Sequence, residues 1–217
     1  MTTNLEKARA LMLHQQLRAG AVLDTRVLET LAAVPREAFV PDRYRGLAFA
    51  DESIPLACGQ CMMTPRQEGL LLQALAIRPD DRVLEIGTGS GYLAACLARL
   101  AAQVTSIEVF PELADTARLR LDAQGVANCE VVLGDVFQLG TQTADVIAVT
   151  ASLPLADPRF EDWLRTGGRL FQIVGPSLPM HAWRVERTGE SDYRRERLFE
   201  TAIPPLLHAP RPPAFSF

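Results

Sequence analysis

Hydrophobic positions from residue 79 onward follow two alternating spacings along the chain. Short apolar runs predict buried strands over residues 82–86, 104–109, 130–133, 146–150 and 170–174. Between them, apolar residues recur at helical spacing and predict helices over residues 92–100, 111–124 and 157–164. Strands that alternate with helices form a parallel sheet with crossover helices, so the pattern predicts an α/β fold.

The residues before this alternating region predict a helical extension. Residues 4–19 have weak helical periodicity. Asp24 is placed to cap a helix that ends before Pro35, and a short helix is predicted over residues 36–40, between two prolines. We therefore expect residues 1–78 to form an N-terminal helical extension and residues 79–217 to form one compact unit.

Two further segments frame the alternating region. Thr64 and Gln67 have the spacing of a capping box, which predicts a helix from Pro65 to Ile77, followed by a turn into the first strand. After the last helix, residues 183–187 and 193–203 are extended segments separated by a turn, which predicts an antiparallel hairpin. The tail from Pro204 is rich in proline and is expected to be an irregular extended strip.

Composition narrows the possible classes of protein. The net charge of −4 over 217 residues argues against an electrostatic nucleic-acid binder. No apolar run reaches the length of a membrane span, and the first residues lack the plan of a signal peptide. We therefore expect a cytosolic protein without membrane or nucleic-acid partners, whose four cysteines are reduced.

A glycine-rich loop carries the most specific chemistry in the chain. Gly87, Gly89 and Gly91 follow the first strand directly and precede an apolar helix, which is the arrangement of a nucleotide-type cradle. Their G-x-G-x-G spacing differs from the G-x-G-x-x-G of dinucleotide binders. Glu85, just before the loop, repels a pyrophosphate and attracts a cation. S-adenosyl-L-methionine carries an ammonium and a sulfonium but no phosphate, so it fits better than NAD or a plain tight turn, the two alternatives.

Two further acids end the next two predicted strands. Glu108 follows Gly91 at the offset of an acid that accepts both hydroxyls of an adenosine ribose. Asp135 can accept the adenine amino group while the next backbone N–H donates to the ring. The residues expected to bind the cofactor are Glu85, Gly87, Thr88, Gly89, Ser90, Gly91, Glu108, Val109, Asp135 and Val136.

Other candidate chemistry is weaker. Cys58 and Cys61 form a lone C-x-x-C ahead of a helix start, where a lowered thiol pKa would favour redox chemistry; a pocket-lining loop is the alternative. Zinc would need two further ligands, and no metal site is expected. The three histidines, His14, His181 and His208, are scattered and are expected on the surface or in satisfied structural roles.

Over nearly its whole length the chain resembles the protein-L-isoaspartate O-methyltransferase family. The motifs that carry the resemblance lie at residues 27–41, 47–51, 54–60, 82–92, 106–108, 134–135 and 167–170. The resemblance implies a Rossmann-like, doubly wound, seven-stranded and mostly parallel sheet with one antiparallel strand. It also implies S-adenosyl-L-methionine as cofactor, S-adenosyl-L-homocysteine as product, and methyl transfer to the α-carboxylate of isoaspartyl residues in damaged proteins. A monomer is implied as well.

The chain departs from this family on the acceptor side. The family usually continues Gly-Gln with Thr-x-Ser and assigns that serine to the reacting centre, whereas this chain has Cys61 and Met63 at those positions. A thioether cannot donate a hydrogen bond to a carboxylate. The acceptor-pocket candidates are Gln60, Cys61, Met63, Thr64, Thr150 and Ser152. Three alternatives stay open: a methyltransferase for another small acceptor, a non-catalytic cofactor-binding protein, and a thiol oxidoreductase.

Overall fold

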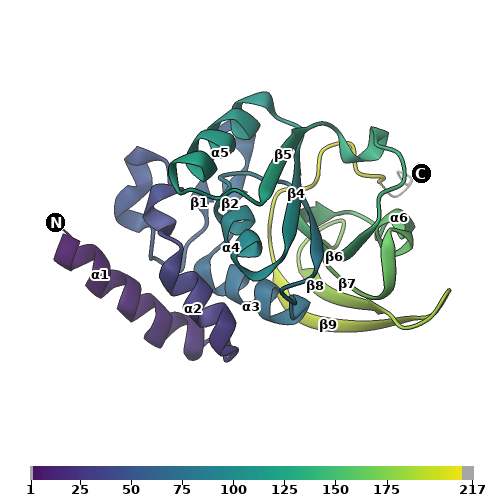
Figure 1. Cartoon of the computed structure of the whole chain (residues 1–217), viewed down its shortest axis with the longest axis horizontal. Helices are drawn as coiled ribbons and strands as arrows, with labels where there is room; N and C mark the ends of the chain where they lie inside the picture. Colours follow the sequence, from purple (N-terminus) through teal and green to yellow (C-terminus); the bar gives the residue numbers. More distant parts are fainter. Residues whose placement is uncertain (1, 212–217) are drawn as a thin grey trace.

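A seven-stranded sheet organises the protein (Figure 1). The structure, a computed structural model, describes residues 2–211. The strand order is β5-β4-β3-β6-β7-β8-β9. The strands are β3 (Arg82–Ile86), β4 (Gln103–Glu108), β5 (Cys129–Leu133), β6 (Ala144–Leu153), β7 (Leu164–Val174), β8 (Met180–Arg187) and β9 (Tyr193–Thr201). A separate two-stranded sheet pairs β1 (Ile54–Pro55) with β2 (Cys61–Met62).

Strand direction confirms the expected α/β class. Strands β5, β4, β3, β6 and β7 are mutually parallel, and β8 is antiparallel to both of its neighbours. The order reverses between β3 and β6, because the chain first builds outward to β5 and then returns to the other side of β3. Ligands of open α/β sheets bind in the crevice at such a switch point.

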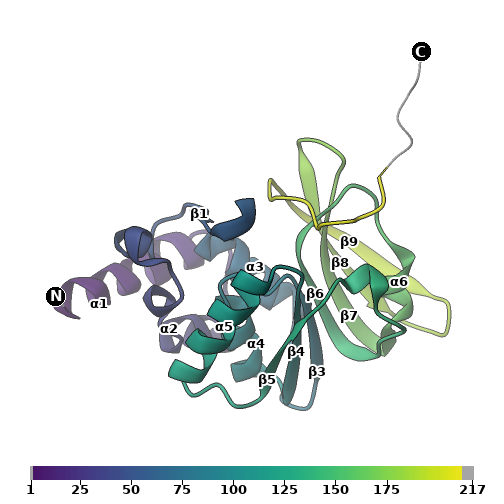
Figure 2. The same cartoon turned by 90° about the horizontal axis from the view of Figure 1, so that it is seen from above.

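Helices cover the two faces of the sheet unequally. Figure 2 shows α2, α3, α4 and α5 gathered on one side of the sheet and α6 on the other. The helices are α1 (Thr2–Leu11), α2 (Thr25–Ala33), α3 (Pro65–Leu75), α4 (Tyr92–Leu100), α5 (Pro111–Ala123) and α6 (Pro158–Asp162). A π-helix, η1 (Met12–Arg18), extends α1, and short 3-10 turns lie at η2 (Arg36–Ala38), η3 (Asp42–Leu47), η4 (Ala57–Gly59) and η5 (Val136–Gln138).

Local capping fixes two of these helices as the sequence predicts. The Asp24 side chain accepts hydrogen bonds from two backbone N–H groups in the first turn of α2. Thr64 and Gln67 form the predicted reciprocal capping box at the start of α3. Each cap satisfies backbone donors that have no partner within the helix, so the boundary is set by the residues themselves.

Several predicted boundaries are wrong, each because tertiary pairing decides them. The helix expected over residues 157–164 ends at Asp162, since Leu164 already pairs with Ala144 in the sheet. The strand expected to stop at Thr150 continues to Leu153 through an irregularity in its pairing with β7. His181, expected before a strand, lies within β8.

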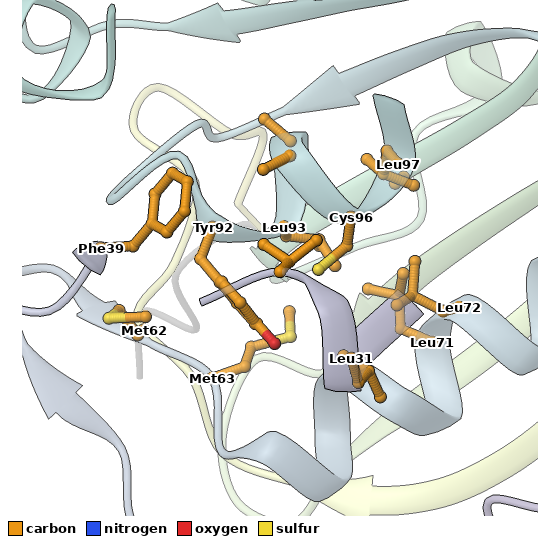
Figure 3. Packing of buried hydrophobic residues seen from close by; sticks show 14 of the residues in the cluster. Leu31, Phe39, Met62, Met63, Leu71, Leu72, Tyr92, Leu93, Cys96 and Leu97 are labelled. Atoms are coloured by element: carbon orange, nitrogen blue, oxygen red, sulfur yellow. The ribbon is translucent and has the colours of Figure 1, made fainter. Parts of the chain in front are cut away.

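The larger hydrophobic core joins the N-terminal helices to one face of the sheet. Figure 3 shows part of this cluster, in which Leu31 of α2 and Leu71 of α3 pack with Leu97 of α4. A buried ion pair also connects β7 to α3. The Arg169 guanidinium binds Asp81 and donates to the carbonyl of Leu75 at the end of α3. A smaller cluster on the other face gathers residues of α6, η5 and the C-terminal strip.

The C-terminal strip, residues 203–211, crosses the carboxyl end of β6. The Ser152 N–H donates to the carbonyl of Pro204, and the Leu206 N–H donates to the carbonyl of Ser152. Residues 212–217, the rest of the expected irregular tail, lie outside the described residues. Within residues 2–211, none of the helices has the length and apolarity that crossing a bilayer requires.

Candidate active site

A cleft of about 620 Å³ lies at the switch point of the sheet. It is formed by the glycine loop, the carboxyl ends of β4, β5 and β6, the loop before β2, and the C-terminal strip. The lining residues are Gln60, Cys61, Ile86, Gly87, Gly89, Ile107, Glu108, Val109, Phe110, Leu113, Gly134, Asp135, Val136, Thr150, Ala151, Ile203, Pro205, Leu206 and Leu207.

A second pocket of about 340 Å³ continues this cleft toward α3. Four residues line both spaces: Cys61, Gly87, Gly89 and Thr150. The other residues of this inner pocket are Leu56, Met62, Met63, Glu68, Glu85, Thr88, Ser90 and Leu93. Glu108 and Asp135 therefore face the outer cleft, whereas Glu85 faces the inner pocket, and one elongated ligand can contact all three acids.

The backbone of the glycine loop has a conformation that residues with a side chain rarely adopt. Gly87, Gly89 and Gly91 all have positive φ, at 99°, 55° and 85°. At Gly87 an added Cβ would also lie 2.5 Å from Thr150 Oγ1. Gly91 does not line either space; it precedes α4 as the N-cap residue. The loop therefore brings backbone close to a ligand, as the sequence predicts.

Glu85 is fully buried at the carboxyl end of β3. Its Oε2 accepts a 2.5 Å hydrogen bond from the Ser106 hydroxyl, which also contacts Thr88 Oγ1 at 2.5 Å. Its Oε1 is buried and has no hydrogen-bond partner among the described residues. Burial raises the pKa of Glu85 to about 8. A cationic ligand group would supply the charge partner that this carboxyl lacks.

Glu108 is held by three backbone N–H groups. Gly89 donates to Oε2 at 2.8 Å, while Val109 and Phe110 donate to Oε1 at 2.9 and 3.1 Å. These bonds leave the carboxylate one remaining acceptor position, on Oε2, so in this arrangement it can accept one ribose hydroxyl and not the two that the sequence predicts. The predicted ribose acid is thus oriented by the glycine loop itself, a link that the sequence spacing does not reveal.

Asp135 has a partner that sequence reasoning missed. Its Oδ1 accepts from the Phe137 N–H at 2.9 Å, and its Oδ2 lies 2.8 Å from His208 Nδ1 and 3.2 Å from Gln138 Nε2. His208 is distant from Asp135 in the sequence, and no local motif predicts the contact. The C-terminal strip therefore reaches the predicted adenine acid as well as forming one wall of the cleft.

The acceptor-side candidates fall into two groups. Gln60, Cys61 and Thr150 line the outer cleft, and Met63 lines the inner pocket while remaining buried in the core (Figure 3). Thr150 and Ala151 lie where the pairing of β6 with β7 becomes irregular. Such irregularities change the direction of side chains and are common near binding sites.

Thr64 and Ser152 lie in neither space. Thr64 Oγ1 accepts the capping bond from the Gln67 N–H, and Ser152 Oγ donates to the carbonyl of Ile203 at 3.0 Å. Both hydroxyls are therefore engaged in structural hydrogen bonds, and neither residue is among those that line the cleft or the inner pocket.

The thiol chemistry considered for Cys58 and Cys61 is not supported. Desolvation raises the pKa of the partly buried Cys61 thiol and, more weakly, of the exposed Cys58 thiol, whose pKa Glu112 and Glu108 raise further; the lowered pKa expected near a helix start is absent. Among residues 2–211, His, Cys, Asp and Glu side chains form no group of three or more that could hold a metal ion.

Comparison with known proteins decides the family. The family model for protein-L-isoaspartate(D-aspartate) O-methyltransferase matches residues 6–208. The chain belongs to this family. Protein-L-isoaspartate O-methyltransferase 2 of Pelobacter propionicus is 41% identical over 209 residues, which cover 95% of this chain and 93% of the relative. A Koribacter versatilis protein-L-isoaspartate O-methyltransferase is 41% identical over 92% of this chain and 90% of its own length.

Solved structures agree on the fold of this isoaspartyl methyltransferase family member. A Plasmodium falciparum protein assigned to the protein-L-isoaspartate O-methyltransferases, solved in complex with S-adenosyl-L-homocysteine, superposes with a TM-score of 0.80. It is 19% identical, and the match covers 91% of this chain and 97% of the other. The expected seven-stranded methyltransferase sheet is thereby confirmed.

Proposed function

We propose that this protein transfers the methyl group of S-adenosyl-L-methionine to the α-carboxylate of isoaspartyl residues in proteins. One observation carries the proposal: in a member of this family, the acids that end β3, β4 and β5 surround one continuous space at the switch point. These acids suit an adenosyl ligand that is cationic and free of phosphate.

Each end of the cofactor has a matching set of residues. The adenine would lie near Asp135 and Val136, and the ribose near Glu108. The methionine end would lie in the inner pocket, where the free Oε1 of Glu85 accepts its ammonium. The assignments of Thr88, Gly89, Ser90 and the other predicted cofactor residues remain proposals on the same basis.

The reaction requires the protein mainly to position the acceptor carboxylate against the methyl group. The bound cofactor supplies an electrophilic methyl group on a positively charged sulfur. An acceptor carboxylate is already ionised near pH 7, so no general base is needed. The protein must place one carboxylate oxygen in line with the methyl group and exclude water.

Gln60 is the residue best placed to orient the acceptor. It lines the outer cleft, and its side-chain amide donates only a long hydrogen bond of 3.4 Å, to the carbonyl of Cys58. No Lys or Arg is among the residues that line the cleft or the inner pocket. The amide can therefore donate to an acceptor oxygen without fixing it in an ion pair.

Labelled methyl transfer to an isoaspartyl peptide, beside the same peptide with normal aspartate, tests this function. We expect label only in the isoaspartyl peptide, and stabilisation of the protein by S-adenosyl-L-homocysteine in a thermal shift assay. Ligand stabilisation without transfer to the isoaspartyl peptide would overturn the proposed acceptor and leave the cofactor assignment in place.

A second candidate is a methyltransferase with a different acceptor. It is favoured by Met63 and Cys61, which give the space shared by cofactor and acceptor a thioether and a thiol in place of two hydroxyls. A screen of small acceptors and lysate proteins with labelled cofactor distinguishes it from a non-catalytic binding protein.

Four sequence-based expectations remain predictions. We infer that residues 79–217 form the core that binds the cofactor, while residues 1–78 supply the acceptor side through the loop at Gln60 and part of the inner pocket. The monomeric state is open to light scattering, and the cytosolic location to fractionation of cells. The absence of nucleic-acid partners is open to a gel-shift assay.

A further inference from the structure

The inner pocket contains two buried carboxyl groups and no basic side chain among the residues that line it. Glu85 reaches it from β3 and Glu68 reaches it from α3. The two acids come from different parts of the chain, one from the strand before the glycine loop and the other from the N-terminal extension. A buried acid without a charge partner is costly, and Glu85 has none among the residues that line the pocket, so this pocket indicates a cationic occupant.

Glu68 is fixed in the pocket wall from behind. The Arg36 guanidinium, which is fully buried and does not line the pocket, donates to Glu68 Oε2. The same guanidinium donates to the carbonyl of Met63 at 2.8 Å and to the carbonyl of Ala48 at 2.8 Å. Arg36 therefore holds Glu68 and the Met63 backbone in one arrangement, and its hydrogen bond to Glu68 uses one of the two carboxylate oxygens, Oε2.

The unpartnered Oε1 of Glu85 is the second, independent sign of a ligand. This atom is buried, and its carboxyl group is 0% exposed, yet none of the described residues bonds to it. Native proteins rarely leave such an atom without a partner, so a ligand donor at this position is expected. An ammonium has three donors and can contact two carboxylates at once.

Building on the proposed function, we propose that Glu68 is a second acidic binding residue for the ammonium of the methionine end, together with Glu85. The site then selects adenosyl ligands by their amino group. A ligand without that group leaves Glu85 Oε1 without a donor and Glu68 with Arg36 as its partner. Glu68 also couples the N-terminal extension to the cofactor, since α3 supplies it and Arg36 orients it.

A pair of ligands that differ at this end tests the proposal. S-adenosyl-L-homocysteine carries the ammonium, whereas 5′-methylthioadenosine has the same adenosine and thioether without the amino-acid end. For Glu68→Gln we expect calorimetry to show an affinity for S-adenosyl-L-homocysteine that is at least about tenfold weaker. The affinity for 5′-methylthioadenosine should stay within about twofold. Glu130→Gln, an exposed acid on β5, is the matched control and should change neither.

The single variant leaves the buried Arg36 charge without its partner, so a second variant protects the test against misfolding. Arg36→Met/Glu68→Leu removes both charges together and should show the same selective loss. Equal losses for the two ligands, or no loss for either, in a folded variant would overturn the role of Glu68. Wild-type protein that binds neither ligand would instead overturn the proposed function, and this inference with it.

Discussion

Gly87 and Thr150 fit against each other at the switch point of the sheet. The Thr150 hydroxyl lies 2.6 Å from the Gly87 carbonyl, and a Cβ added to Gly87 would lie 2.5 Å from the same hydroxyl oxygen. The turn after β3 is thereby locked to β6, on which Thr150 lines both the cleft and the inner pocket. Both residues must keep their size for the cleft to keep its shape.

Gly87→Ala should therefore damage both the fold and the cofactor site. The residue has φ of 99°, and a non-glycine residue in such a conformation costs on the order of 1–3 kcal/mol. We expect a lower free energy of unfolding and at least about tenfold weaker binding of S-adenosyl-L-homocysteine. Gly140→Ala, at an exposed glycine with no atom within 4 Å of its added Cβ, is the control. Wild-type affinity in Gly87→Ala would contradict the close fit.

The raised pKa of Glu85 predicts that the stability of the ligand-free protein depends on pH. Its pKa is about 8 in the folded protein, above the ordinary value of 4.5, because burial disfavours the charged form. The folded state then holds a proton that the unfolded state releases, so stability falls as pH rises from about 4.5 to 8. Where the two states differ by a full proton, the slope is about 1.4 kcal/mol per pH unit.

Unfolding of wild type and Glu85→Gln between pH 5 and 8 measures this contribution. The wild-type free energy of unfolding should fall more steeply with pH than that of the variant. Glu68, whose pKa burial raises to about 7, adds a similar slope that ends at lower pH and is common to both proteins. Parallel pH profiles would show that Glu85 is ionised in the folded protein.

Met63→Ser should raise the methyl-transfer activity and lower the stability of the protein. A serine hydroxyl at this position restores a hydrogen-bond donor beside the acceptor, so kcat/KM for an isoaspartyl peptide should rise by about tenfold, the effect of roughly 1.4 kcal/mol of transition-state stabilisation. Met63 is 5% exposed and packs in the core, so the same change should lower the free energy of unfolding by about 2–5 kcal/mol. Peptide methylation and denaturant unfolding measure the two effects. Unchanged transfer by a folded variant would mean that the acceptor lies elsewhere.

Ser152→Ala tests the attachment of the C-terminal strip. Loss of its hydrogen bond leaves the carbonyl of Ile203 without that donor, which should cost about 1–3 kcal/mol. Because Ile203, Pro205 and Leu206 line the cleft, we expect S-adenosyl-L-homocysteine to bind several-fold more weakly. Ser191→Ala, at an exposed serine in the turn between β8 and β9, should change neither quantity. Loss of stability with unchanged affinity would show that the strip is not part of the binding wall.

Local sequence signals were sufficient wherever the physical cause is itself local. The caps at Asp24 and Thr64 are made by residues within three positions, and the glycine loop needs its backbone conformation whatever surrounds it. Sheet pairing decided the boundaries that were predicted wrongly. Leu164 belongs to β7 because it pairs with Ala144, and no local pattern encodes that contact.

The sequence by itself determined the fold class and the row of acids at the strand ends, because periodicity and motif spacing encode these features directly, and its motifs resemble those of the family that the comparisons show. Only the tertiary structure decided which groups meet. It brings His208 to Asp135, Ser106 to Glu85, and Glu68 to the inner pocket that Glu85 also lines. These partners come from segments far apart in the chain, and their contacts depend on how the sheet, α3 and the C-terminal strip pack around one space.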